Sequence, residues 1–184
     1  MVQKWNDIEL EIILLLLKKS IHVRSISKEL KVPNATLIRK LKVLEKKNII
    51  DYKKIGKNKE YSLKKNIFTR KLIINAENYR LIKLMDKHQL LSPLFEDILK
   101  ECNCDIIILF GSYAKDNPNE ESDIDIYIET NNPSIKKSIE LVNSKISVKL
   151  GKFDKNSLLI KEIIKSHTII RGAEKFYEKI GFFD

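Results

Sequence analysis

"GSYAKDNPNEESDIDIYIET", residues 111–130, is the stretch that decides the fold of the second half of this chain. It follows the apolar run IIILF directly and opens on Gly111 and Ser112. A glycine lets backbone N–H groups approach a phosphate closely, and the serine hydroxyl adds a hydrogen-bond donor. Side chains two positions apart on a strand share a face, so Asp123 and Asp125 are expected to project together. The stretch therefore predicts a nucleotide-binding turn beside two carboxylates.

The paired aspartates predict a metal site. Two carboxylates at this spacing repel each other unless a cation lies between them. Hard carboxylate oxygens beside a phosphate favour Mg²⁺, or Mn²⁺, as in sites of phosphoryl transfer. We therefore expect Asp123 and Asp125 to be metal ligands and catalytic residues. The alternative is an acidic turn that keeps an edge strand soluble.

Residues 105–129 resemble the nucleotidyltransferase superfamily that includes DNA polymerase β, and more narrowly the minimal nucleotidyltransferases of archaea and bacteria. The family pattern is an apolar strand, Gly-Ser-x-Ala-x-Gly, a spacer and Ser-Asp-x-Asp. The matching residues are Gly111, Ser112, Ala114, Ser122, Asp123 and Asp125. A weaker resemblance extends over residues 92–184. It implies a nucleoside triphosphate partner, ATP in the first place, and transfer of NMP to a hydroxyl on protein, RNA or a small molecule.

The chain departs from this family pattern at two points. The last glycine of the first motif is Asp116, which brings a negative charge close to the expected triphosphate. Active relatives also carry a third carboxylate on a later strand, where Ser147 and Lys149 are expected to face the site. Glu129 and Asp154 are displaced from that position. The alternative function is therefore a transcriptional regulator or antitoxin-like protein whose catalytically degenerate domain serves nucleotide sensing or assembly.

Charge divides the chain into two halves. The 184 residues carry a formal net charge of +10. Residues 1–90 hold 22 Lys and Arg against 9 Asp and Glu, whereas residues 91–184 hold 13 against 16. Such an asymmetry indicates two domains with different partners, and the basic half suits a polyanion.

The basic half follows the order of a winged helix-turn-helix. Helices are expected over residues 6–20, 23–32 and 33–50, and a hairpin over residues 49–64. The expected caps are Asn6 or Asp7 for the first helix and Ser25 or Ser27 for the second, and the third helix is expected to open on Pro33. Residues 7–65 resemble winged-helix transcriptional regulators, a resemblance that rests on order and spacing.

This resemblance implies binding of double-stranded DNA. The N-terminal part of the third helix would meet base edges through Asn34, Thr36, Arg39 and Lys40. The wing would bring Lys53, Lys54, Lys57 and Lys59 to phosphates. The alternative is a solvated surface on a protein-interaction domain. Residues 21–65 hold 14 Lys and Arg against 4 Asp and Glu, which favours DNA.

The fold class expected from these patterns is α+β: a helix-rich winged helix-turn-helix domain (residues 1–65), a linker helix (66–91) and a mixed-sheet nucleotidyltransferase-like domain (92–184). The linker helix shows an apolar stripe that could serve a homodimer, and its residues are Phe68, Leu72, Tyr79, Ile82 and Met85. No apolar run approaches the length of a membrane span. Cys102 and Cys104 are expected to be reduced thiols, which together with the missing span predicts a cytoplasmic protein.

Overall fold

The computed structural model describes residues 7–183, and the chain divides into two compact units between Tyr79 and Arg80. Each unit forms its own hydrophobic core, so the two are described separately. The fold is α+β, as the sequence predicts.

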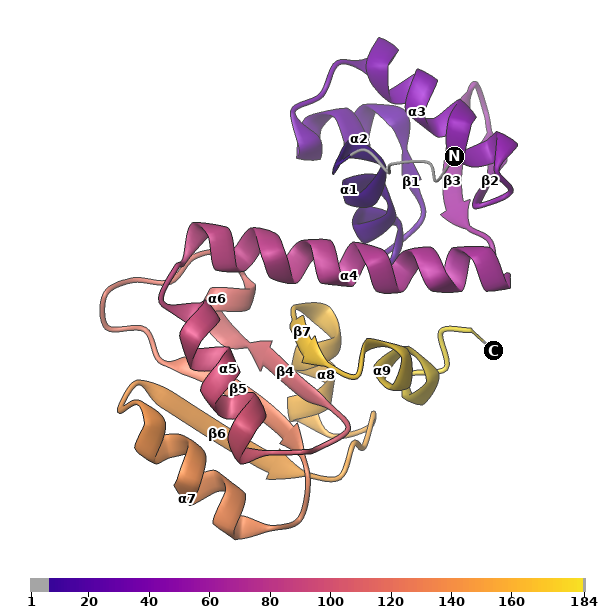
Figure 1. The fold of residues 1–184 in the computed structure, drawn as a ribbon. Helices are drawn as coiled ribbons and strands as arrows, with labels where there is room; N and C mark the ends of the chain where they lie inside the picture. Colours follow the sequence, from indigo (N-terminus) through magenta and orange to yellow (C-terminus); the bar gives the residue numbers. More distant parts are fainter. Residues whose placement is uncertain (1–6, 184) are drawn as a thin grey trace, which may run out of the picture. The chain divides into compact units, whose positions relative to one another are not determined.

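The first unit is built from three helices, the N-terminal part of α4 (Ile67–Lys87) and a small antiparallel sheet (Figure 1). The helices are α1 (Asp7–Leu16), α2 (Val23–Leu30) and α3 (Asn34–Lys46). The sheet has the order β1-β3-β2, with β1 (Ile21–His22), β2 (Ile50–Ile55) and β3 (Asn58–Leu63). The leucines of α3 are spaced to lie on one face, and Leu37, Leu41 and Leu44 are fully buried. The winged helix-turn-helix plan is thereby confirmed.

The predicted cap of α2 was wrong. This helix begins at Val23, two residues before Ser25, with His22 at the N-cap position and no side-chain capping bond. The cause lies in β1, because its ladder with β3 holds the chain up to His22 and the helix starts directly afterwards. The His22 ring is bound instead to the wing, with Nδ1 3.0 Å from the Lys59 carbonyl oxygen. Pro33, predicted to open the third helix, lies at the N-cap position directly before α3, and the predicted cap Asn6 lies outside the described residues.

Helix α4 (Ile67–Lys87) forms as one long helix, but its apolar stripe differs from the predicted one. Of the predicted stripe only Leu72 is buried, while Phe68 is 51% and Ile82 is 54% exposed. The buried face follows a neighbouring row of the helix instead and consists of Thr69, Leu72, Ile73, Ala76, Glu77 and Leu84. The predicted domain limits at 65 and 92 stay a prediction.

The second unit contains a four-stranded mixed sheet in the order β6-β5-β4-β7. Its strands are β4 (Ile107–Phe110), β5 (Ile124–Glu129), β6 (Ile146–Gly151) and β7 (Thr168–Arg171). The β4 strand is antiparallel to both β5 and β7, whereas β5 and β6 are parallel and are joined by α7 (Pro133–Val142).

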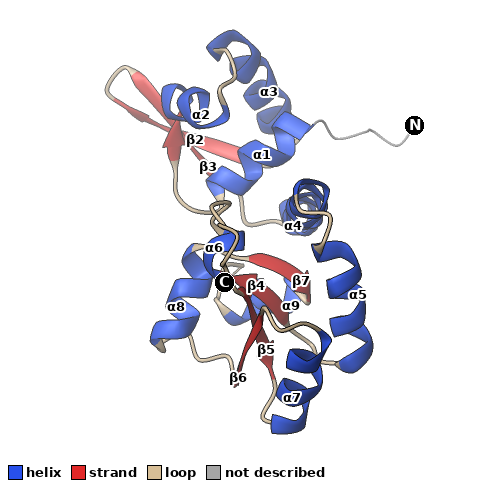
Figure 2. Ribbon diagram, turned by 90° about the vertical axis from the view of Figure 1, so that its left-hand side faces the viewer, coloured by secondary structure: helices blue, strands red, loops and turns tan. Residues whose placement is uncertain are grey.

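Helices cover both faces of this sheet (Figure 2). One face packs against α5 (Leu91–Glu101) and α7 through a core that includes Phe95, Ile126 and Ile139. The other face carries α8 (Leu158–Lys165). There α9 (Ala173–Lys179) places Phe176 against Phe153, which in turn stacks edge-on with Tyr127 of β5. Because residues alternate along β5, the face that carries Asp125 is the one opposite α5 and α7.

The prediction of reduced cysteines was wrong, because Cys102 and Cys104 form a disulfide. The extended backbone at Cys102 sets the two Cα atoms 5.4 Å apart, within the ordinary span of a disulfide. The cytoplasmic prediction loses this support. No helix among residues 7–183 has the length and apolar content needed to cross a membrane.

Candidate functional site

The turn after β4 packs against the carboxylate of Asp125. Phe110, the last residue of β4, pairs with Asp125 in the antiparallel ladder, and the chain then enters the short helix α6 (Gly111–Ala114). Gly111 has a φ of +72°, and a Cβ built on it would lie 2.2 Å from Asp125 Oδ2. Only glycine fits this approach. The predicted nucleotide-binding turn and the predicted metal-binding strand therefore lie side by side.

The two aspartates interact as the sequence spacing implies. Asp123 is exposed just before β5, and Asp125 is half-buried within the strand. Burial raises the pKa of Asp125 above its usual value, and the negative charge of Asp123 raises it further. Like charges are thus held close together at this point of the sheet.

Two side chains of β6 oppose that rise. Ser147 lies directly across the parallel ladder from Asp125, and Lys149 lies across from Tyr127. The Lys149 ammonium and a hydrogen bond with the Ser147 hydroxyl both lower the pKa of Asp125, by less than burial and Asp123 raise it. Ser147 and Lys149 therefore face the aspartates, as expected from the strand register.

Ser122 closes the turn that leads into the aspartates. Its hydroxyl accepts a hydrogen bond from the Asn119 backbone N–H (2.8 Å) and donates one to Asn119 Oδ1 (2.9 Å). The serine of the Ser-Asp-x-Asp motif thus holds the backbone immediately before Asp123.

Asp116, at the position of the last glycine in the family motif, has a left-handed backbone conformation. Its φ is +60°, in the left-handed region, which Asp tolerates better than most residues. Its carboxylate accepts a hydrogen bond from Lys87 Nζ at 2.5 Å. The negative charge that departs from the family pattern is therefore paired with a cation.

The third carboxylate is absent from the strand where relatives carry it. Glu129 accepts hydrogen bonds from Lys179 Nζ (2.8 Å) and from the Phe153 backbone N–H (3.3 Å), so its charge is engaged beside α9. Asp154 accepts from the Asn156 N–H in a local turn. Within residues 7–183 no group of three His, Cys, Asp or Glu side chains could hold a metal ion.

The sequence analysis missed Glu162. This residue of α8 lies close enough to Asp125 for its charge to raise the pKa of that carboxyl further, and it forms an ion pair with Lys115 (3.0 Å). No pattern in the sequence could have shown it, because α8 and β5 are brought together only by the tertiary fold.

In the first unit, the residues predicted to meet bases on α3 lie in different surroundings. Asn34 and Arg39 are exposed, and the Arg39 guanidinium donates to Thr36 Oγ1 at 3.5 Å. Lys40 donates to the buried carboxylate of Glu9 at 3.1 Å, so its charge is engaged inside the domain.

The wing presents a concentrated positive charge. Lys53 and Lys54 are exposed on β2, and Lys57 is exposed in the turn between β2 and β3. Lys54 lies directly opposite Lys59 in the ladder, an arrangement of like charges that an anion would relieve. The Lys59 ammonium lies 3.4 Å from the centre of the Tyr52 ring.

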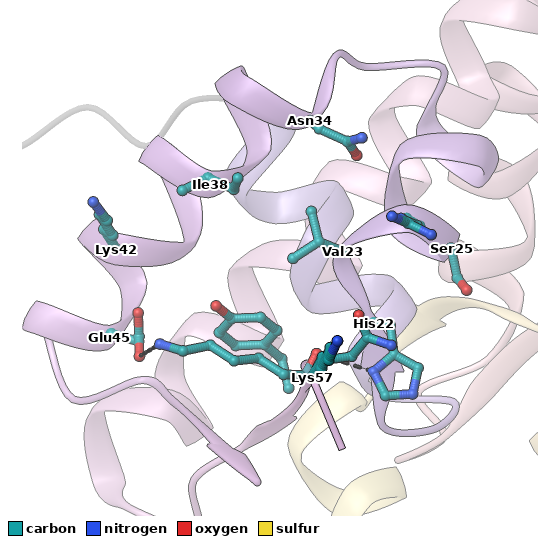
Figure 3. A pocket seen from close by; sticks show the side chains of 12 residues that line it. His22, Val23, Ser25, Asn34, Ile38, Lys42, Glu45 and Lys57 are labelled. Atoms are coloured by element: carbon teal, nitrogen blue, oxygen red, sulfur yellow. Dashed lines mark hydrogen bonds and ion pairs between the residues drawn. The ribbon is translucent and has the colours of Figure 1, made fainter. Parts of the chain in front are cut away.

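A groove of about 550 Å³ lies between the start of α2, the outer face of α3 and the wing (Figure 3). Among the predicted DNA-binding residues, Asn34, Lys57 and Lys59 line it, and Thr36, Arg39, Lys40, Lys53 and Lys54 do not. The roles predicted for all these residues stay predictions.

Comparison with known families agrees with both halves of this description. Residues 95–178 match the family model of polymerase beta nucleotidyltransferases, and residues 7–52 match that of the arsR family of bacterial regulatory proteins. No curated protein and no solved structure matched the chain. The chain thus joins an N-terminal helix-turn-helix DNA-binding domain to a nucleotidyltransferase domain of the DNA polymerase β superfamily.

Proposed function

We propose that the second unit binds a nucleoside triphosphate with a divalent cation and transfers its NMP group to a hydroxyl acceptor. The observation that carries this proposal is the approach of Gly111 to Asp125, with room for no Cβ between them. The turn is suited to phosphate, and the pair of carboxylates is suited to a cation. A ligand that contains both a phosphate and a bound cation, such as a metal–nucleotide complex, needs the two features side by side.

The donor set fits Mg²⁺ or Mn²⁺. Asp123 and Asp125 offer carboxylate oxygens, the ligands these cations prefer. Burial and, after it, the charge of Asp123 raise the pKa of Asp125, and a bound cation would offset the repulsion between the two carboxylates. When bound, the cation would neutralise charge on the reacting phosphate. Two carboxylates hold one such ion with the help of phosphate oxygens and water.

The protein groups around the aspartates would bind and orient the nucleotide. The N–H groups after Gly111 and the Ser112 hydroxyl are donors for phosphate oxygens. In the transfer, the acceptor oxygen bonds to the α-phosphorus, the bond from that phosphorus to the oxygen bridging the α- and β-phosphates breaks, pyrophosphate leaves, and the hydroxyl proton passes to solvent water. Lys149, whose charge acts on Asp125, would supply part of the positive charge that a second metal ion, held with the help of a third carboxylate, supplies in active relatives.

Nucleotide binding tests this proposal first. Labelled ATP should bind the full chain only with Mg²⁺ or Mn²⁺, and the double substitution Asp123→Asn with Asp125→Asn should abolish binding. Glu121→Gln is the matched control, since it removes one charge from the same exposed turn without touching the pair. Equal binding by the double variant and the wild type would contradict the metal site.

For the first unit, we propose that the wing lysines hold DNA phosphates. The support is the exposure of Lys53, Lys54 and Lys57, together with the like positive charges of Lys54 and Lys59 directly across the ladder from each other. The homodimer, the protein or RNA acceptor and the cytoplasmic location stay predictions.

A further inference from the structure

The groove of the first unit combines positive charge with apolar lining residues, among them Val23 and Ile38. Its charged lining comprises Arg24, Lys42, Lys57 and Lys59 against the single acid Glu45. Glu45 lies 3.9 Å from the Lys59 ammonium, so the acid is itself partly neutralised. The surplus of cations makes a polyanion the occupant that fits by charge.

One row of α3 faces this groove. Asn34, Ile38 and Lys42 follow at intervals of four residues and therefore lie on one side of the helix, where all three line the groove (Figure 3). The buried leucines of α3 occupy a different side. Lys40 is held by Glu9, so it is not on the groove row.

Ile38 is the unusual member of this row. It is 43% exposed, lies between Asn34 and Lys42, and faces a groove with basic walls. An aliphatic side chain that lines a cationic groove gains nothing from phosphates. The major-groove edge of DNA offers it one apolar partner, the C5 methyl group of thymine, and offers the carboxamide of Asn34 the N6 and N7 atoms of adenine.

We propose that Asn34 and Ile38 read A·T base pairs in the major groove, Asn34 on adenine and Ile38 on the thymine methyl group. Arg24 and Lys42 bind the adjacent phosphates. This inference rests on DNA binding by the helix-turn-helix domain and adds which row of α3 selects the sequence. It adds Ile38 to the residues expected to contact bases, beside Asn34.

The test removes one methyl group from the DNA. Duplexes are first selected from a random pool with the full-length protein, and each thymine of the selected sequence is then replaced singly by uracil. At one or two positions the wild-type protein should lose about fourfold in affinity, the effect of leaving one CH₂-sized group without its apolar contact. Ile38→Ala should bind thymine and uracil duplexes equally at those positions, while Ile38→Val should keep most of the difference.

Two controls separate sequence reading from general effects. Ile55→Ala removes an equally exposed isoleucine of the wing that does not line the groove, and it should keep the full thymine dependence. Arg24→Ala and Lys42→Ala should weaken binding to all duplexes alike and reduce its dependence on salt. Asn34→Ala should lose the preference for an A·T pair next to the methyl-sensitive thymine.

The outcomes distinguish this inference from DNA binding itself. Salt-dependent binding without a selected sequence, or equal thymine dependence in Ile38→Ala and the wild type, would overturn the reading role and leave DNA binding intact. The same holds if a small anion proves to fill the groove while duplex binding is unaffected by Ile38→Ala. A wild-type protein that binds no duplex at low salt would overturn both.

Discussion

At the scale of single residues, the site depends on the close packing of Gly111 against Asp125, which leaves no space for a Cβ atom at position 111. Gly111 combines a positive φ with a Cβ position 2.2 Å from Asp125 Oδ2, whereas Gly56 has a φ of +59° and nothing within 4 Å of its Cβ position. A substitution at Gly56 therefore tests backbone strain alone, whereas one at Gly111 tests backbone strain together with the steric clash.

Gly111→Ala should lower the free energy of unfolding by more than Gly56→Ala does. Backbone strain alone costs about 1–2 kcal/mol at either position. At Gly111 the new methyl group must also displace the Asp125 carboxylate, so Mg²⁺-dependent nucleotide binding should be lost as well. Urea denaturation of both variants measures the first effect. Equal destabilisation, with nucleotide binding retained in Gly111→Ala, would contradict the close approach.

Asp125 gives a pH-dependent prediction. Its pKa is raised in the folded protein by burial and by Asp123, so the unfolded chain ionises this group at lower pH than the folded one. Stability contributed by this group is therefore lost as pH rises from the unfolded to the folded pKa. Asp125→Asn removes that loss, and its melting temperature should exceed the wild-type value at pH 7.

The advantage of Asp125→Asn should shrink as the pH falls toward the ordinary pKa of an aspartate, about 3.9. Thermal melting of both proteins between pH 4 and 7 without divalent ions measures it. Glu121→Gln, an exposed acid in the same turn, should show no comparable gain. A variant that is less stable than the wild type at pH 7 would contradict the repulsion.

At the scale of elements, the hairpin of β2 and β3 is the element whose proposed DNA contacts can be tested most directly. Lys54 and Lys57 are exposed on it, and Lys54 faces another lysine across the ladder. Replacing both by Ala should weaken duplex binding and lower the slope of log K against log salt by about 2. Lys137→Ala, an exposed lysine of α7, is the control and should leave the slope unchanged. The same slope in the double variant would exclude the wing from the interface.

Elements with a strong local pattern could be predicted from the sequence. The buried leucines of α3, the turn at Gly56 and the alternation along β5 all specify their structure through neighbours in the chain. The capping of α2 and the buried row of α4 could not, because β1 pairing decides the first and packing along a 21-residue helix decides the second.

The candidate site likewise has features that could be predicted from the sequence and features that could not. The face shared by Asp125, Ser147 and Lys149 follows from strand period and register. The approach of Glu162 and the ion pair of Asp116 with Lys87 follow from contacts between distant segments, which periodicity does not specify. Which residues of α3 line the groove also depends on the position of the β2–β3 hairpin, which periodicity does not specify either.

At the scale of the whole molecule, the division of charge matches the division of domains. The basic half contains the arsR-type helix-turn-helix, and the half with a slight excess of acids contains the nucleotidyltransferase domain. Two unlike partners, a nucleic acid and a nucleotide, account for this asymmetry better than one. NMP transfer is the activity proposed for the second domain.

The most direct measurement compares ATP labelled at the α-phosphate with ATP labelled at the γ-phosphate, each incubated with the full chain, Mg²⁺ and either total RNA or a protein mixture. NMP transfer should place the α label, and not the γ label, on an acceptor, with pyrophosphate released. The label should disappear in the Asp123→Asn, Asp125→Asn variant and persist in Glu121→Gln. Transfer of the γ label, or of neither label to any acceptor despite Mg²⁺-dependent binding, would contradict the proposed activity.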